Sequence, residues 1–338
     1  MFQRTQPFRR AVQAATAALC LWIGVEFFLF MRWGASGGRT HYVPHPPGAE
    51  GFLPISALMS LRQWLGTGHI TTIHPAGLFI LVAILALGLF FKKAFCGWLC
   101  PVGTLSEILW ELGHRTLGRN LALPRWADWP LRGIKYLLLA FFLWAVLGMD
   151  FQGLEAFLQS PYNRMADLKM YLFFARLSTF TVVTLLMLGV LSVLVKGFWC
   201  RYLCPYGALL GVLSLVSPFK VRREESTCID CGRCTRACPA GIPVHRAKRV
   251  RSDECMACLR CVDACPVKDT LAMEAPGRFK VQGLHFGALV VGLFLVVCGL
   301  AMATEHWRNE VSREEYLRRI PELDSPLYQH NRGQAPEQ

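Results

Sequence analysis

Five long apolar stretches divide the chain. Each approaches the roughly 20 apolar residues that cross a hydrocarbon core. They lie near residues 11–31, 73–91, 132–149, 177–195 and 283–303. The first contains Glu26 within its apolar run and no small-residue cleavage site, so we expect a retained helix rather than a signal peptide. The pattern predicts a mainly α integral membrane protein with five transmembrane helices.

Charge is distributed unevenly between these stretches. If the N-terminus is cytoplasmic, segments 1–10, 92–132 and 196–282 lie inside and together hold the whole net charge of +13, whereas the outer segments sum to zero. Lys and Arg are enriched on the cytoplasmic side of membrane proteins. We therefore predict a bacterial inner (cytoplasmic) membrane protein, embedded in the lipid bilayer, with its N-terminus inside and its C-terminus periplasmic.

Composition supports this interpretation of the charge. The chain is 53% hydrophobic and only 17% charged, which does not suit a water-soluble surface. The positive charge therefore belongs to membrane topology, and nucleic acid is not expected as a partner.

Eight of the fourteen cysteines form two similar runs. Both follow Cys-x2-Cys-x2-Cys-x3-Cys-Pro, the spacing of bacterial ferredoxins with two 4Fe-4S clusters, in which the fourth cysteine of each run ligates the other cluster. We predict two such clusters with crossed ligands: Cys228, Cys231, Cys234 and Cys265 for the first, and Cys255, Cys258, Cys261 and Cys238 for the second. Zinc is the alternative for Cys-x2-Cys pairs, but two complete runs disfavour it. Thiolates persist in the reducing cytosol, which agrees with the inner position of this segment.

A shorter cysteine motif occurs twice. Cys96 and Cys100, and then Cys200 and Cys204, share the pattern aromatic-Cys-x-aromatic-Leu-Cys-Pro-x-Gly. Proline disfavours helix at the preceding residue, so each second cysteine should lie at an extended break before an amphipathic helix on the inner membrane face. Two parallel hairpins related by an axis along the membrane normal would bring the four cysteines together as an additional metal centre. Redox-active dithiols and inert buried cysteines are the alternatives.

These features predict three regions. Residues 1–219 form a membrane domain in which helices 1–4 are two repeated hairpins. Residues 220–282 form a small cytoplasmic two-cluster ferredoxin-like segment of α+β type, and residues 283–338 form the fifth transmembrane helix and a periplasmic tail.

Over roughly residues 75–275 the chain resembles the NapH/NosR-type membrane-bound 4Fe-4S ferredoxins, which combine Cys-x3-Cys-Pro motifs with a two-cluster segment. The resemblance implies electron transfer between the quinone pool and a partner redox protein, as a component of a quinol-dehydrogenase-type oxidoreductase system. NosR-type proteins also carry a large outer flavin domain, but the first outer loop here has only about 40 residues, so flavin is not expected. A copper-ion reductase of the CcoG assembly-factor type is one alternative. A redox sensor or assembly scaffold is another.

Two features towards the outer side are candidates for quinone binding. Glu26 is an ionisable group at lipid depth, which suggests a proton acceptor from quinol or, alternatively, a hydrogen bond to a neighbouring helix. The amphipathic stretch 55–65 in the first outer loop could lie in the membrane interface and line one side of a quinone pocket.

Overall fold

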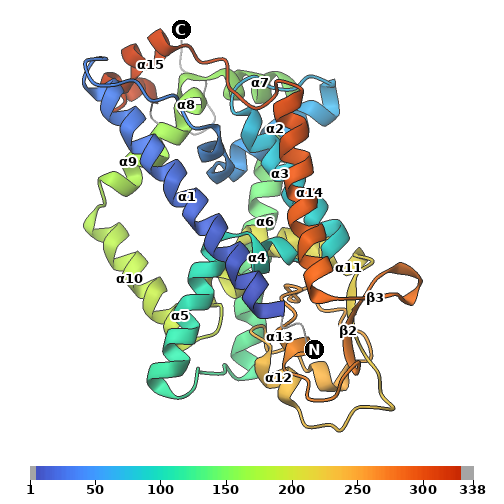
Figure 1. The fold of residues 1–338 in the computed structure, drawn as a ribbon. Coiled ribbons are helices and arrows are strands. Elements are labelled where there is room, and N and C mark those ends of the chain that lie inside the picture. Colours follow the sequence, from blue (N-terminus) through green and yellow to red (C-terminus); the bar gives the residue numbers. More distant parts are fainter. Residues whose placement is uncertain (1–4, 329–338) are drawn as a thin grey trace. The chain divides into compact units, whose positions relative to one another are not determined.

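The computed structural model describes residues 5–328 (Figure 1). The chain divides into two compact units, each built from three separate segments. The first unit comprises Met1–Ala18, Ile84–Phe141 and Phe180–Phe294, and the second comprises Leu19–Ala83, Phe142–Thr179 and Leu295–Gln338. The compact units therefore interleave along the chain, and the predicted division at residues 219 and 282 stays a prediction.

Three helices among residues 5–328 are long and apolar enough to cross a membrane, namely α1 (Thr5–Ala35), α6 (Arg125–Leu147) and α14 (Gly283–Ala303). A fourth span is present if α9 (Ala166–Ala175) and α10 (Thr179–Leu194), which meet at an angle of 81°, act as one. The chain is thus a mainly helical membrane protein, with helices at all five predicted positions. The count of five spans is not confirmed.

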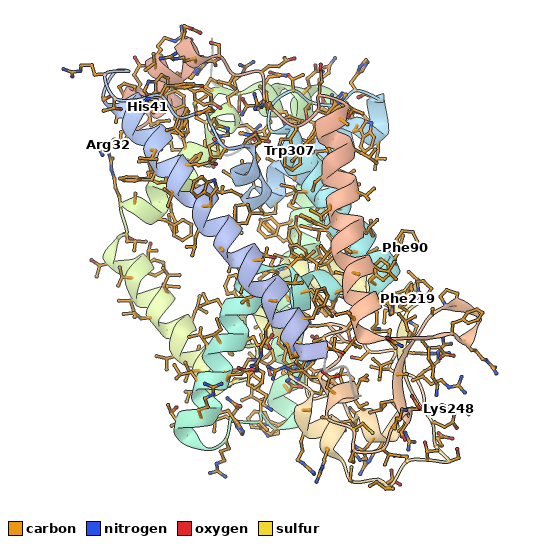
Figure 2. The ribbon with its side chains drawn as sticks, in the orientation of Figure 1. Arg32, His41, Phe90, Phe219, Lys248 and Trp307 are labelled. Atoms are coloured by element: carbon orange, nitrogen blue, oxygen red, sulfur yellow. The ribbon has the colours of Figure 1, made fainter. Side chains whose placement is uncertain are left out.

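The second predicted span is short for a structural reason. Helix α3 (Pro75–Phe91) has 17 residues, because His74 and Lys92, on either side of it, have positive φ values of 57° and 61°. A left-handed residue interrupts helical hydrogen bonding at that position. Large apolar side chains still face outward here, as Figure 2 shows for Phe90, which is 47% exposed.

The repeated cysteine motifs have similar local structures. Helix α4 (Ala94–Trp98) leads to Cys100 and then to α5 (Pro101–Leu117), while a π-helical turn (Trp199–Leu203) leads to Cys204 and then to α11 (Pro205–Val216). Cys100 (φ −73°, ψ 120°) and Cys204 (φ −76°, ψ 110°) are both extended. The predicted break and the predicted helix after it are confirmed in both copies.

The ferredoxin-like segment has a small antiparallel sheet in the order β1 (Lys220–Arg223), β2 (Leu271–Glu274) and β3 (Lys280–Val281). Lys220 pairs with Glu274 and Arg223 with Leu271, so β1 and β2 join the two ends of the cysteine-rich stretch. Each cysteine run contains one short helix, α12 (Arg233–Ala237) in the first run and α13 (Arg260–Asp263) in the second. Two short 3-10 turns, η3 (Val244–Arg246) and η4 (Pro276–Arg278), lie outside the runs. An apolar core that includes Trp98, Val221 and Phe286 supports the segment.

The second unit packs short elements around two apolar cores. One core includes Trp33, Met165 and Tyr328, and the other includes Met59 and Leu154. Its short elements are η1 (Pro47–Phe52), α2 (Pro54–Thr67), α7 (Phe151–Gln159), α8 (Pro161–Arg164), α15 (Arg313–Arg319), η5 (Ile320–Glu322) and η6 (Pro326–Tyr328).

Candidate iron–sulfur sites

Two cavities in the ferredoxin-like segment are each lined by four cysteines. One cavity is lined by Cys238, Cys255, Cys258 and Cys261, and the other by Cys228, Cys231, Cys234 and Cys265. In each cavity the fourth cysteine comes from the other run. The structure therefore groups the cysteines into the crossed sets that their spacing predicts.

The loops between these cysteines have the backbone shape of an anion cradle. Asp230 and Gly232 in the first run have positive φ values of 49° and 66°, and Ala257 and Leu259 occupy the equivalent positions with 48° and 59°. Left-handed residues alternating with right-handed ones turn successive N–H groups towards one side, as at many phosphate and iron–sulfur sites. A branched residue such as Leu259 adopts this conformation at a cost of about 1–2 kcal/mol. The residues present therefore fit an anionic, thiolate-ligated cluster.

The thiols of the second set are poor acids by themselves. Burial, and then the neighbouring Cys258, raise the pKa of Cys238 to about 12. Burial also raises the pKa of Cys258 and that of Cys261. Coordination to a metal deprotonates a thiol outright. Metal binding to this donor set therefore releases protons.

The two cysteine-lined cavities differ in their surroundings. Cys231 of the first set is exposed, and its neighbour Ile229 is 65% exposed. Lys248, labelled in Figure 2, has a side chain that is 69% exposed. The first set is therefore open to solvent at Cys231, although its Cys234 is buried, whereas the loop of the second set packs against other parts of the first unit.

The contact with the second set is made by the first Cys-x3-Cys-Pro motif. Trp98 Nε1 donates a hydrogen bond of 3.0 Å to the carbonyl of Ala257. A Cβ added to Gly97 would lie 2.8 Å from the carbonyl oxygen of Met256 and 3.5 Å from Cβ of Cys258, so only glycine permits this approach. The residues between Cys96 and Cys100 are thus packed directly on the loop that carries Cys255 and Cys258.

The four cysteines of the repeated motif lie within electrostatic range of one another. Burial raises the pKa of Cys96 well above its usual value; Lys93 opposes this shift, and Cys100, Cys200 and Cys204 add to it. Within residues 5–328, no group of three or more His, Cys, Asp or Glu side chains is arranged to hold a single metal ion. The assignment of these four cysteines to one centre stays a prediction.

Each second cysteine of the motif also caps a helix. The Sγ atoms of Cys100 and Cys204 accept hydrogen bonds of 3.4 Å from the backbone N–H groups of Gly103 and Gly207, respectively. A helix N-terminus favours negative charge. At Cys204, burial nevertheless raises the pKa of the thiol, and the hydrogen bond from Gly207 only opposes this rise. The glycine of the sequence pattern is needed because a Cβ at Gly103 would lie 2.2 Å from the carbonyl oxygen of Cys96.

A buried ion cluster adjoins the second run. Glu254, which precedes Cys255, pairs with Lys93 (3.5 Å) and with Lys135, and the two lysines are at most 3% exposed. Tyr136 donates to Asp253 in the same segment. From sequence, Lys135 is only a charge near the start of an apolar stretch, because its partner lies 119 positions away.

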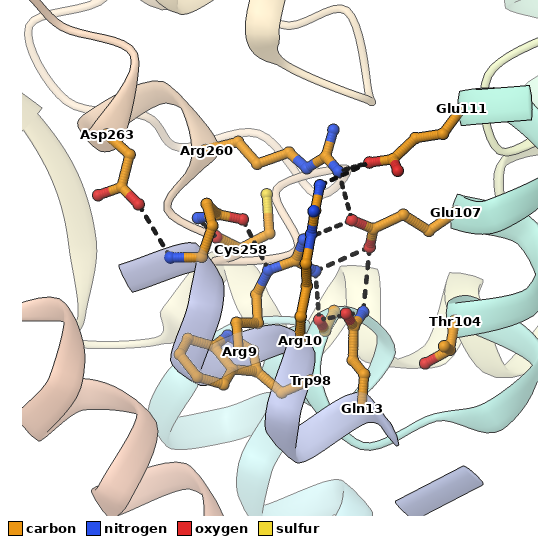
Figure 3. A network of polar contacts seen from close by, with 12 residues as sticks. Arg9, Arg10, Gln13, Trp98, Thr104, Glu107, Glu111, Cys258, Arg260 and Asp263 are labelled. Carbon is orange, nitrogen blue, oxygen red and sulfur yellow. Dashed lines mark hydrogen bonds and ion pairs between the residues drawn. The ribbon is translucent and has the colours of Figure 1, made fainter. Parts of the chain in front are cut away.

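A second network joins the N-terminal helix to the same loop (Figure 3). Arg9 is fully buried and donates to the carbonyl of Gly97 (2.9 Å) and to Glu107 (2.8 Å). Arg260, which lies between Cys258 and Cys261, pairs with Glu107 at 2.6 Å. Burial would raise the pKa of Glu107, but Arg9, with Arg260, holds it at about 2. From sequence, Arg9 belongs only to the cytoplasmic excess of positive charge, because its partner Glu107 lies 98 positions away.

Glu26 lies in α1 and is half-buried, with no hydrogen bond or ion pair to the residues that the structure describes. Its role as a proton acceptor stays a prediction.

The fold and the cysteine-lined cavities define a membrane protein of ferredoxin type. A family model described as "4Fe-4S binding domain" matches residues 73–120 and 177–224, and one described as "4Fe-4S dicluster domain" matches residues 220–266. The first model thus matches each copy of the repeated motif separately. The protein binds iron–sulfur clusters.

Similar proteins extend this comparison. The chain is 43% identical to the putative electron transport protein YccM of Escherichia coli K12. The match covers 96% of this chain and 92% of YccM. It is 33% identical to the methylamine utilization ferredoxin-type protein MauN of Methylorubrum extorquens and 28% identical to the ferredoxin-type protein NapH of Haemophilus influenzae, covering 61% and 66% of their lengths. No solved structure matches. The chain belongs to the NapH/NosR-type family of membrane-bound ferredoxin-like iron–sulfur electron-transfer proteins.

Proposed function

We propose that the protein transfers electrons between the quinone pool and a partner redox protein. The observation that carries this proposal is the packing of the first Cys-x3-Cys-Pro motif, through Gly97 and Trp98, on the loop of Cys255 and Cys258. This contact joins membrane-side cysteines to a ferredoxin-like segment whose other cysteine set, at Cys231, is open to solvent. When bound, iron–sulfur clusters supply one-electron chemistry in such a protein.

The ligands that we assign follow from the cavities. Cys228, Cys231, Cys234 and Cys265 hold one 4Fe-4S cluster, and Cys255, Cys258, Cys261 and Cys238 hold the other. The crossed lining of the two cavities and the left-handed loop residues support this assignment. We also propose that Cys96, Cys100, Cys200 and Cys204 share an additional metal centre, which is supported by the match of the 4Fe-4S binding domain model to each copy of the motif and by the similar local structure of the two copies.

The third centre is tested with cysteine variants. Four thiolates on one centre act as a unit, so Cys96→Ser should lose as much iron per protein as the quadruple Ser variant. The matched control is Cys20→Ser in α1, which lies outside both cysteine motifs and should keep its iron. Undiminished iron in the quadruple variant would contradict the shared centre.

The electron-transfer function is tested on anaerobically purified full-length protein with counted iron and acid-labile sulfide. Dithionite-reduced clusters should be reoxidised rapidly by a soluble quinone. Rapid reoxidation by Cu(II) alone would instead support a copper reductase, and reoxidation by neither would support a sensor or scaffold.

We propose that the N-terminus and the ferredoxin-like segment are cytoplasmic and the C-terminus periplasmic, supported by the placement of the whole net charge of +13 on the inner segments. Alkaline phosphatase fused after Gln338 should be active, and fused after Lys220 inactive. The structure describes residues 5–328, so the fusion after Gln338 tests only the orientation that the charge distribution predicts. The opposite pattern would reverse the orientation.

A further inference from the structure

The second unit buries two histidine–carboxylate pairs. Glu50, His74 and Asp167 are at most 1% exposed, and the His45 side chain is 8% exposed. His45 Nε2 lies 2.5 Å from Oδ2 of Asp167, and His74 Nδ1 lies 3.6 Å from Oε1 of Glu50. Asp167 also lies within electrostatic range of His74. The two pairs therefore form one cluster, and burying so many ionisable groups is costly unless they are paired or functional.

Further contacts link this cluster to the C-terminal part of the unit. Asn309 Nδ2 donates to Oε1 of Glu50 and to Oη of Tyr316, both at 3.1 Å. The Tyr316 ring stacks on His45 with centroids 5.6 Å apart and an interplanar angle of 13°. The cluster is therefore held by segments from both ends of the chain.

Hydrogen bonding in this unit is incomplete within residues 5–328. His74 Nε2 lies 2.7 Å from the carbonyl oxygen of Asn163, and His74 Nδ1 is paired with Glu50. On α2, the side-chain oxygens of Ser56, Ser60 and Gln63 are buried and lack partners. Nearly all buried polar groups in proteins bond to protein, water or a ligand, so these atoms point to a bound polar group.

Helix α2 exposes part of its apolar surface. It buries Ala57 and Met59 together with Ser56, Ser60 and Gln63, whereas Ile55 and Leu65 are 43% and 77% exposed. Exposed apolar side chains of this kind suit a helix in contact with the membrane interface. A ligand that is dissolved in the bilayer can therefore reach the unit along this helix.

We propose that the second unit contains the site of quinol oxidation, and that the His45–Asp167 and His74–Glu50 pairs accept the two protons. This inference rests on the proposed function and deepens it by naming the site. When a quinol becomes a quinone, one O–H bond breaks at each ring oxygen and two electrons leave. Iron–sulfur clusters, when bound by the cysteines of the protein, would accept these electrons one at a time. One proton goes to the imidazole of His45, whose charge Asp167 stabilises, and the other goes to Glu50, which His74 orients.

The pH dependence of the reaction follows from the same groups. The ionisable groups that face His45 and His74 among the described residues are their two carboxylate partners and Tyr316, and the Arg164–Glu315 pair (3.3 Å) flanks Tyr316. A general base works only when it is unprotonated, so replacing either proton acceptor should remove its contribution to the pH dependence of quinol oxidation.

The experiment measures the reduction of the clusters by decylubiquinol, and separately by dithionite, in full-length protein in lipid nanodiscs between roughly pH 6 and 9. Loss of a general base costs about 10²-fold or more. His45→Gln and Glu50→Gln should therefore slow quinol-driven reduction by at least about that factor and flatten its pH profile. Iron content and dithionite reduction should not change. The control is His41→Gln, an exposed histidine of the same loop (Figure 2), which should behave like the wild type.

Wild-type rates and pH profiles in both variants would overturn the inference. Equal slowing in His41→Gln would also overturn it, because the effect would then belong to the loop as a whole. If His45→Gln lost iron, Glu50→Gln, which keeps the size of the side chain and an acceptor for Asn309, would decide the question. A wild-type protein that dithionite reduces and decylubiquinol does not would refute the proposed function itself.

Discussion

Replacing Arg9 should change the reduction potential of one cluster and not of the other. Arg9 is buried beside Gly97 and lies within electrostatic range of Cys258, and its charge opposes the rise that burial causes in the pKa of the Cys258 thiol. Reduction adds negative charge to a cluster, so a nearby cation favours the reduced form and raises the potential. Arg9→Gln should therefore lower the potential of the second cluster.

The size of this shift can be estimated from the packing. A unit charge roughly 10 Å from the cluster, at an effective dielectric constant of about 20, contributes about 1.7 kcal/mol. For a one-electron couple this equals roughly 70 mV. The variant should still fold, because Glu107 keeps its contacts with Arg260 (2.6 Å) and Gln13 (3.0 Å).

The assay is a potentiometric titration followed by EPR, which resolves the two clusters. Arg9→Lys is the matched control, since it keeps the charge but loses the paired hydrogen bonds, and its shift should be less than half as large. The cluster of Cys228, Cys231 and Cys234 serves as the internal reference. Equal shifts in both clusters, or equal shifts in the Lys and Gln variants, would refute the electrostatic reasoning.

Three further predictions concern the same unit. Cys238→Ser should perturb mainly the EPR signal of the cluster held by Cys255, and loss of only the other signal would show that the ligands are not crossed. Gly97→Ala should alter the same signal because the new Cβ would lie 2.8 Å from the Met256 carbonyl oxygen, whereas Gly133→Ala, with open space around it, should not; identical spectra would exclude a tight contact. Glu254→Gln removes the ion-pair partner of two buried lysines, so it should cost about 3–5 kcal/mol of stability and lower the thermal midpoint, while the exposed Glu225→Gln should leave the stability within about 0.5 kcal/mol of wild type.

Local spacing in the sequence predicted part of the backbone around the cysteines. The Cys-Pro step favours the extended conformation seen at Cys100 and Cys204, which depends only on neighbouring residues. The crossed ligand sets stay a prediction, and the two cavities are consistent with them. Each set takes its fourth cysteine from the other run, so its grouping depends on the tertiary structure as well as on spacing.

The apolar stretches predicted where helices lie but not how long each one is. Hydropathy does not reveal the left-handed residues His74 and Lys92, which limit α3, or the bend between α9 and α10. The backbone at these points depends on contacts made elsewhere in the fold. The number of spans therefore could not be read from composition alone.

Only the tertiary structure decided which charges meet. Arg9 and Glu107 are 98 positions apart, and His45 and Asp167 are 122 apart. From sequence these side chains are isolated charges in loops and at helix ends. An ion pair buried in a protein depends on distances of a few ångströms between segments that are remote along the chain, and no local pattern encodes such distances.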